Sequence, residues 1–249
     1  MVADRWTQTV RRQLASGRLL PLGGVADGAW IVESAAAGAL RRAAATAVPD
    51  ARLDTLRLSL ADPTTAAGSA VPPPPSALPV GPLRVTADFA AALDRPLPVV
   101  ADALRRAVRA AASETLGAVV ESVDLRATEL LEGLTAGAPV PEEVPPDPEG
   151  DAEVVRAVLS VPGVVGLVPL FGRAVRVGEG DGKAHAQAQF AVREGRRVLD
   201  TVREVRAAVA GVLAGRTSGP VTVAAVVTGV LSPGAPRSSD AGRGGPSRR

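Results

Sequence analysis

The stretch that decides the fold is LRVTADFAAALDRPLPVVADALRRAVRAAASETLGAVVESVDLRATELL, residues 83–131. It predicts a strand, a long helix and a second strand. Apolar and polar residues alternate over residues 84–89, as in a strand with one buried face. Asp-Arg-Pro at residues 94–96 predicts the start of a helix, because proline lacks the N–H that stays unpaired in a first helical turn. Gly117 predicts its end, and a strand is expected over residues 119–127.

The predicted helix has one apolar face and one charged face. The apolar positions recur at helical spacing, and they are Leu97, Val100, Leu104, Val108 and Ala111. Asp102, Arg106 and Arg109 belong to the opposite face, where Asp102 and Arg106 form a favourable i,i+4 pair. The sequence therefore predicts a helix that packs on a sheet through one side.

The same pattern occurs a second time, over residues 185–231. With a shift of 101 residues, Phe89 falls on Phe190, Arg105 on Arg206 and Val108 on Val209. One residue is lost in the loop that follows the helix, after which residues 123–128 lie over residues 223–228. A self-match at such a long period indicates two copies of one supersecondary unit.

The sequence thus predicts an α/β (α+β) protein of two similar small domains, each a three- to four-stranded sheet covered by two helices. In the first domain we expect a strand at 18–22, a helix at 30–47 and a strand at 53–60. The second is expected to begin with a helix at 152–159. The predicted segments are an N-terminal arm (1–17), a first domain (18–135) with an exposed Pro-rich insertion (62–82), an acidic Pro-rich linker (136–150), a second domain (151–231) and a disordered basic tail (232–249).

Composition excludes several kinds of site. The chain has no cysteine, so thiolate metal sites and disulfides are impossible. His185 is the only histidine, and no nucleophile can be identified for a His-based triad. The run GEGDGK at residues 178–183 lacks the residues of a phosphate-binding loop and predicts a hairpin turn. The sequence therefore predicts no catalytic, cofactor-binding or metal-binding residue, and a protein that is not an enzyme.

Charge and hydropathy bear on location. The net charge is only +2, and the high isoelectric point reflects arginine, which does not deprotonate in the working range. The sequence shows no signal peptide and no apolar run of the length that spans a bilayer. A cytoplasmic protein without a transmembrane segment of its own is the resulting expectation.

Two stretches are candidate interaction surfaces. One is the apolar segment 158–171. The other is a set of arginines on the two equivalent helices: Arg105, Arg106, Arg109, Arg203 and Arg206. Such faces can bind RNA or anionic lipid. Because acidic residues are interleaved with them and aromatic residues are missing, a solvated face with salt bridges is the other interpretation.

Short motifs in both halves resemble one known family. They are Val161-Pro162-Gly163-Val164, Leu97-Pro98-Val99-Val100, Ala107-Val108-Arg109 and Val123-Asp124-Leu125. With the order helix, strand, strand, Pro-started helix and strand, they resemble the bacterial alkaline shock and general stress protein family of the envelope stress response. The chain departs from the family pattern in its two copies, in the insertion at 62–82, and in Asp50 where the motif has glycine.

The resemblance implies small domains without catalytic residues, located at the inner face of the cell membrane. It further implies a small membrane-anchored partner and association with related family members or with a second copy. The expected function is a non-enzymatic scaffold or protein–protein interaction module of the envelope stress response. The alternative is an RNA- or ribosome-associated module that uses the arginine faces, although the interleaved acids make nucleic acid the weaker expectation.

Overall fold

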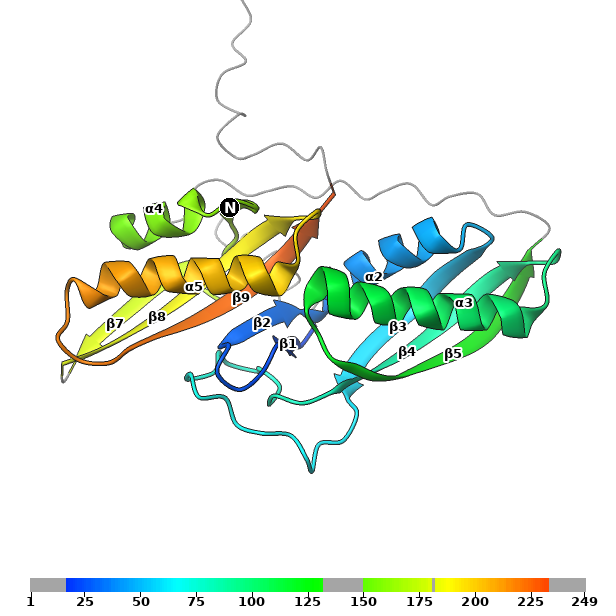
Figure 1. Cartoon of the computed structure of the whole chain (residues 1–249), viewed down its shortest axis with the longest axis horizontal. Helices are drawn as coiled ribbons and strands as arrows, with labels where there is room; N and C mark the ends of the chain where they lie inside the picture. The colour runs from blue at the N-terminus through cyan, green and yellow to red at the C-terminus, as the bar shows by residue number, and fades with distance from the viewer. Residues whose placement is uncertain (1–16, 132–149, 181, 233–249) are drawn as a thin grey trace, which may run out of the picture.

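The computed structural model describes residues 17–131, 150–180 and 182–232 (Figure 1). Its content is mixed α and β, with two sheets, as the sequence predicts. The first part of the chain contains β1 (Leu19–Leu22), β2 (Ala29–Val32), α2 (Glu33–Ala47), β3 (Ala51–Leu60), β4 (Leu83–Ala92), α3 (Leu97–Ala110), the π-helical turn η1 (Ala111–Leu116) and β5 (Val120–Leu131). The second contains α4 (Ala152–Ser160), β6 (Val164–Leu167), β7 (Val175–Gly180), β8 (Lys183–Arg193), α5 (Val198–Ala214) and β9 (Val221–Leu231).

The central stretch folds as predicted, into β4, α3 and β5. Val85 and Phe89 are buried on one face of β4, and Leu104 and Val108 on one face of α3. α3 begins at Leu97, directly after the predicted start signal at residues 94–96. Its N-cap is Pro96, in an extended conformation and without a side-chain cap, so Asp94 does not cap the helix. Asp94 lies two residues too early to accept a hydrogen bond from the first turn. Gly117 ends the helix in the left-handed conformation that glycine adopts without strain.

The two strand–helix–strand segments share one pairing geometry. β4 and β5 are parallel and joined by α3, while β8 and β9 are parallel and joined by α5. Phe89 pairs with Ala127 and Phe190 pairs with Val227, and a register shift follows each pair. β3 runs antiparallel to β4, and β6 and β7 together run antiparallel to β8. The positions aligned by the sequence shift are therefore equivalent in the structure.

Residues 19–32 lie in a different sheet from the one that the sequence predicts. β1 pairs with β2, and β2 pairs in parallel with β9, so that this second sheet has six strands instead of three or four. The helix predicted at 30–47 is wrong at its start, because Trp30 and Ile31 are strand residues. Both are buried between β1 and β9. A helix beginning there would leave the edge of β9 without this partner strand.

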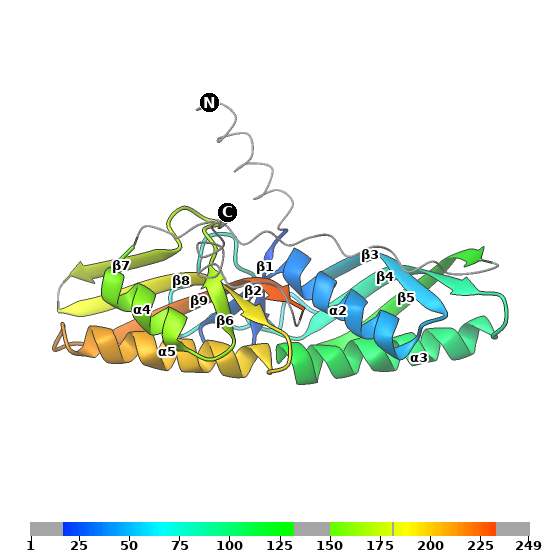
Figure 2. The same ribbon diagram turned by 90° about the horizontal axis from the view of Figure 1, so that it is seen from above.

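One hydrophobic cluster extends through both sheets. α3 and α5 follow one another along the same side of the sheets (Figures 1 and 2). α2 packs on β3 and also on β9. From α2, Arg42 donates to the carboxylate of Glu194 (2.7 Å) and to the carbonyl of Val230 (2.5 Å). The helix that follows β2 therefore contacts both sheets.

The Pro-rich insertion is only partly exposed. The N–H of Ala70 donates to the carbonyl of Val25 (2.9 Å), and that of Leu78 to the carbonyl of Leu19 (2.9 Å). Val71 and Pro74 are buried, so the prediction of a fully exposed connector is wrong for this part. The hydrogen bonds hold the insertion against β1 and the loop after it. The predicted arm, linker and tail lie outside the described residues, except for residues 17, 150 and 232.

Because the core is continuous, we expect a disruptive substitution in one half of the protein to unfold the other half as well. Leu104→Asp and Val205→Asp each place an unpaired charge at a fully buried position. Burying such a charge removes a large part of the roughly 5–15 kcal/mol by which a domain is stable. We expect both variants to lose the whole cooperative transition in thermal unfolding followed by circular dichroism. Ala110→Asp, at an exposed position of α3, is the control and should melt like the parent. A remaining transition of reduced amplitude would mean that the halves fold separately.

Candidate functional site

The second sheet is covered on both faces. On its outer face, the face away from the helices, the connection between β6 and β7, residues 168–174, lies against Gln189 of β8 (Figure 2). Gln189 lies beneath this segment and is fully buried. Its Oε1 accepts hydrogen bonds from the N–H groups of Leu170 (3.0 Å) and Phe171 (2.8 Å). Its Nε2 donates to the carbonyls of Phe171 (3.3 Å) and Arg173 (3.0 Å). One amide side chain therefore fixes the covering segment.

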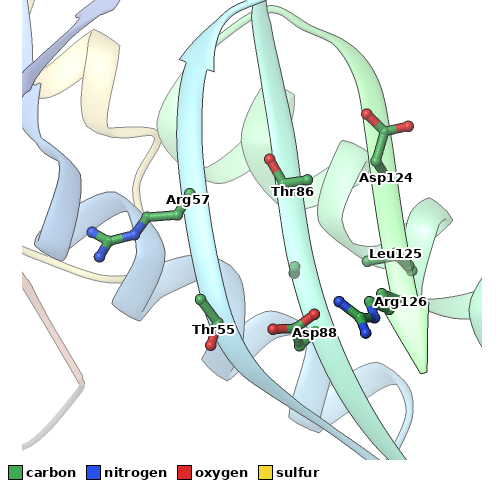
Figure 3. Close-up of a pocket in the computed structure, with 8 residues that line it drawn as sticks. Thr55, Arg57, Thr86, Asp88, Asp124, Leu125 and Arg126 are labelled. Atoms are coloured by element: carbon green, nitrogen blue, oxygen red, sulfur yellow. The ribbon is translucent and has the colours of Figure 1, made fainter. Parts of the chain in front are cut away.

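The outer face of the first sheet is open. It forms a shallow groove of about 340 Å³ (Figure 3), which is lined by Thr55, Arg57, Thr86, Ala87, Asp88, Asp124, Leu125 and Arg126. Asp88 occupies the position that Gln189 has in the second sheet. Figure 3 shows Asp88 beside Arg126, its register partner on β5, while Arg57 extends away from both. Within the described residues, no ion pair joins any of these three to another side chain.

Other charges on this outer face are paired. Arg52 lies 2.6 Å from the carboxylate of Asp54 and 3.5 Å from that of Glu129. Arg84 lies 3.8 Å from the carboxylate of Asp124. The signs alternate across all three strands, so the face carries no uniform field for a polyanion. Mixed polar groups of this kind suit a protein segment better.

The edge of β5 is also open. In the second sheet the equivalent edge, that of β9, is occupied by β2. Within the described ranges no strand pairs with the outer edge of β5. Leu130 near its end is 52% exposed. Leu93 follows β4 at the same end of the sheet and is 61% exposed, and Val99 in the first turn of α3 is 48% exposed. We call the outer face of β3–β5, the edge of β5 and these three side chains the open surface.

Two of the five predicted arginines have equivalent structural roles. Arg105 donates from α3 to the carbonyl of Val123 on β5 (3.4 Å). Arg206 donates from α5 to the carbonyl of Val223 on β9 (2.9 Å). Arg206 is half-buried, and this burial lowers the pKa of its guanidinium from the usual value. Both side chains attach a helix to the strand that follows it.

The other three arginines differ in their surroundings. Arg203 pairs with Asp27 of the β1–β2 loop (2.8 Å), and this hydrogen bond lowers the pKa of the Asp27 carboxyl. Arg106 and Arg109 are exposed and make no ion pair within the described residues. The i,i+4 pair predicted for Asp102 and Arg106 does not form, because Asp102 pairs with Arg105 at i,i+3 (2.8 Å). Arginines without an ion pair therefore remain on α3, whereas the two arginines of α5 are engaged within the chain. The predicted pair of equivalent basic faces does not form.

The apolar segment 158–171 is wrong as a candidate contact surface. Most of its large side chains are buried, among them Val158, Val164 and Leu167. They belong to α4 and β6 and pack against the core. Leu159 is the exception, at 42% exposed. An apolar segment of this length is read equally well as core.

His185 is placed at the end of the second sheet. Its Nδ1 lies 2.8 Å from the hydroxyl of Thr222, and burial lowers the pKa of the imidazole. The run 178–183 forms the predicted hairpin, with Gly180 paired to Lys183; Asp181 lies outside the described residues. In the part of the chain that the structure describes, no three His, Asp or Glu side chains are grouped to hold a metal ion.

The sequence gives no signal for the open edge of β5. It does give one for the role of Gln189: the shift of 101 residues places Gln189 on Asp88, so that an amide stands in one strand where a carboxylate stands in the other. An amide can donate and accept, whereas a carboxylate only accepts. The amide therefore indicates which of the two strands, β8, lies beneath another backbone segment.

Comparisons of the chain with models of known protein families, with curated proteins and with solved structures find no match. None of the described helices combines the length and the apolar character needed to cross a membrane.

A structural role for Arg206 can be separated from a surface role. Arg206→Met removes the hydrogen bond to Val223 and leaves the carbonyl of this buried residue without the arginine donor. We expect the free energy of unfolding to fall by about 1–2 kcal/mol. Arg106→Met on the exposed side of α3 is the matched control, with a change within about 0.5 kcal/mol. Equal effects in urea unfolding would contradict this assignment.

The covering segment can be tested through Gln189. Gln189→Glu keeps the length of the side chain and the acceptors for Leu170 and Phe171, but its carboxylate cannot donate to the carbonyls of Phe171 and Arg173. We expect faster amide hydrogen exchange confined to residues 168–174 and a loss of about 1–3 kcal/mol of stability. Asp88→Gln at the equivalent open position should leave exchange in β3 and β5 unchanged. Unaltered exchange at 168–174 in the Gln189 variant would show that other contacts hold the segment.

Proposed function

We propose that this chain is a non-enzymatic interaction module of the envelope stress response, recruited to the inner face of the bacterial membrane through a membrane-anchored partner. The resemblance of its motifs to the alkaline shock family motivates the setting. One structural observation supports an interaction module. Among residues 17–131, 150–180 and 182–232, nothing covers the outer face of the first sheet or pairs with the edge of β5, whereas segments of the chain occupy the equivalent places in the second sheet.

The composition of the open surface favours a protein partner. Leu93, Val99 and Leu130 are large apolar side chains that remain about half exposed or more. Burial of each by a partner contributes roughly 1–2 kcal/mol, since part of each is already covered. The alternating charges of the outer face supply polar contacts that select the partner and its orientation.

The arginines support an RNA-binding function less well. Arg105, Arg203 and Arg206 are engaged inside the chain. Arg106 and Arg109 remain on α3, and two phosphate contacts would provide only weak, salt-sensitive binding. Exposed aromatic rings for base stacking are not found on this helix.

Fractionation of cells that contain the full chain tests the proposal. We expect recovery with membranes, together with a membrane-spanning protein identified by mass spectrometry. The double variant Leu93→Asp/Val99→Asp should shift most of the protein to the unbound fraction, because it places charge in the apolar part of the open surface. Leu159→Asp, on the exposed side of α4, is the matched control and should remain with the membranes.

Two outcomes would contradict the proposal. One is an unbound parent protein that co-purifies with nothing. The other is recovery with ribosomes or RNA that is lost at high salt and in Arg106→Glu/Arg109→Glu, which would favour the RNA-binding alternative.

A further inference from the structure

The chain itself shows how a strand binds the edge of β9. β2 lies parallel to β9, with Ala29 opposite Ala225, Trp30 opposite Val226 and Ile31 opposite Val227. The N–H of Ala225 donates to the carbonyl of Gly28 (3.0 Å). β9 therefore directs backbone groups outward along this edge.

In the part of the chain that the structure describes, the edge of β5 has the same geometry without a partner strand. Because β5 pairs with β4 as β9 pairs with β8, the positions of Ala225, Val226 and Val227 correspond to Leu125, Arg126 and Ala127. Leu125 is half-buried, and Arg126 and Ala127 are exposed. Unpaired backbone groups on an edge strand bind an extended segment through main-chain hydrogen bonds.

Arg105 does not obstruct this edge. It donates to the carbonyl of Val123, and Arg206 makes the equivalent contact with Val223 in the sheet where β2 is bound. Both contacts lie two residues before the first paired position, which is Ala225 in β9 and Leu125 in β5. The second copy thus shows that the arginine and an added strand are compatible.

We propose that the edge of β5 binds an extended segment of a partner protein, parallel to β5, that presents a small residue, an acidic residue and a large apolar residue in succession. This rests on the proposed function as an interaction module. The small residue faces Leu125, which is larger than Ala225, and the large apolar residue faces Ala127, which is smaller than Val227. The acidic residue replaces Trp30, because its neighbour on the outer face is Arg126 instead of Val226.

Two observations, the charge of Arg126 and the burial of β2, favour a partner protein over a second copy of this chain. Arg126 makes no ion pair within the described residues, so its guanidinium can pair with an acidic side chain on the added strand. β2, the strand that occupies the equivalent edge, is buried between β1 and β9 in each copy and is not free to add to another. Pairing of two β5 edges is an outcome that the test distinguishes.

The probe is a peptide, acetyl-Thr-Gly-Ala-Glu-Ile-Val-Thr-amide, which follows Gly28–Val32 with glutamate in place of Trp30. Titrated into the 15N-labelled full chain, it should shift amide resonances of residues 123–130 in a saturable manner. N-methylation of the peptide amides that face β5 should abolish the shifts. N-methylation of the alternate amides should leave them, because those groups point away from the sheet.

Exchanging the charges of Arg126 and the peptide glutamate tests whether these two residues lie beside each other. Arg126→Glu should weaken binding of the peptide about tenfold, and replacing the peptide glutamate by arginine should restore it. Arg57→Glu is the matched control, because Arg57 is also unpaired on the outer face but lies on β3, away from the edge. It should bind like the parent.

Several results would overturn the proposal: no saturable shifts, shifts outside β5, equal binding of both N-methylated peptides, or no restoration by charge exchange. A parent chain that sediments as a dimer, and as a monomer after Ala127→Pro, would assign the edge to a second copy instead. Membrane recovery in the fractionation test is independent of these results. Its loss with peptide binding intact would overturn the proposed function and not the strand site.

Discussion

The pairing of β2 with β9 is the contact on which the rest of the structure depends. It joins residues near the start of the described chain to residues near its end, and it places Trp30 and Ile31 inside the second sheet. α2 begins at the next residue and is thereby held between the two sheets, where Arg42 reaches Glu194 and Val230. The large hydrophobic cluster that both sheets share follows from this position of α2. Such a non-local contact forms only after much of the chain has been brought together.

The two copies have the same framework but differ in what covers them. Position 88 carries a carboxylate and position 189 an amide, and only the amide can satisfy both donors and acceptors of an overlying backbone segment. The open face of the first sheet has alternating charged and hydroxyl side chains, which remain hydrated without a cover. The same strand–helix–strand arrangement thus lies beneath other segments of the chain in the second sheet and presents an accessible surface in the first.

Sequence periodicity was sufficient for the parts of the fold that depend on local pattern. The strands around Phe89 and Phe190 and the helices between the parallel pairs follow directly from alternation and helical spacing. β2 could not be predicted in this way, because a four-residue strand adjoining a helix has too little sequence to show a period of its own. Its conformation depends on β9. The separate roles of Arg105 and Arg106 were also hidden, since they are adjacent on one helix and differ only in the groups that lie near them.

An open edge strand is a hazard unless its side chains limit what can pair with it. β5 carries Glu121, Asp124, Arg126 and Glu129 along its length, whereas β9 carries no charged residue. β9 can do without charged side chains because β2 is bound to it within the same chain. β5 has no such neighbour in the described residues, and its charges make pairing with an arbitrary strand unfavourable. A strand whose charges complement those of β5 at each position, with an acid beside Arg126, can still pair, so that protection against aggregation and selection of a partner arise from one set of side chains.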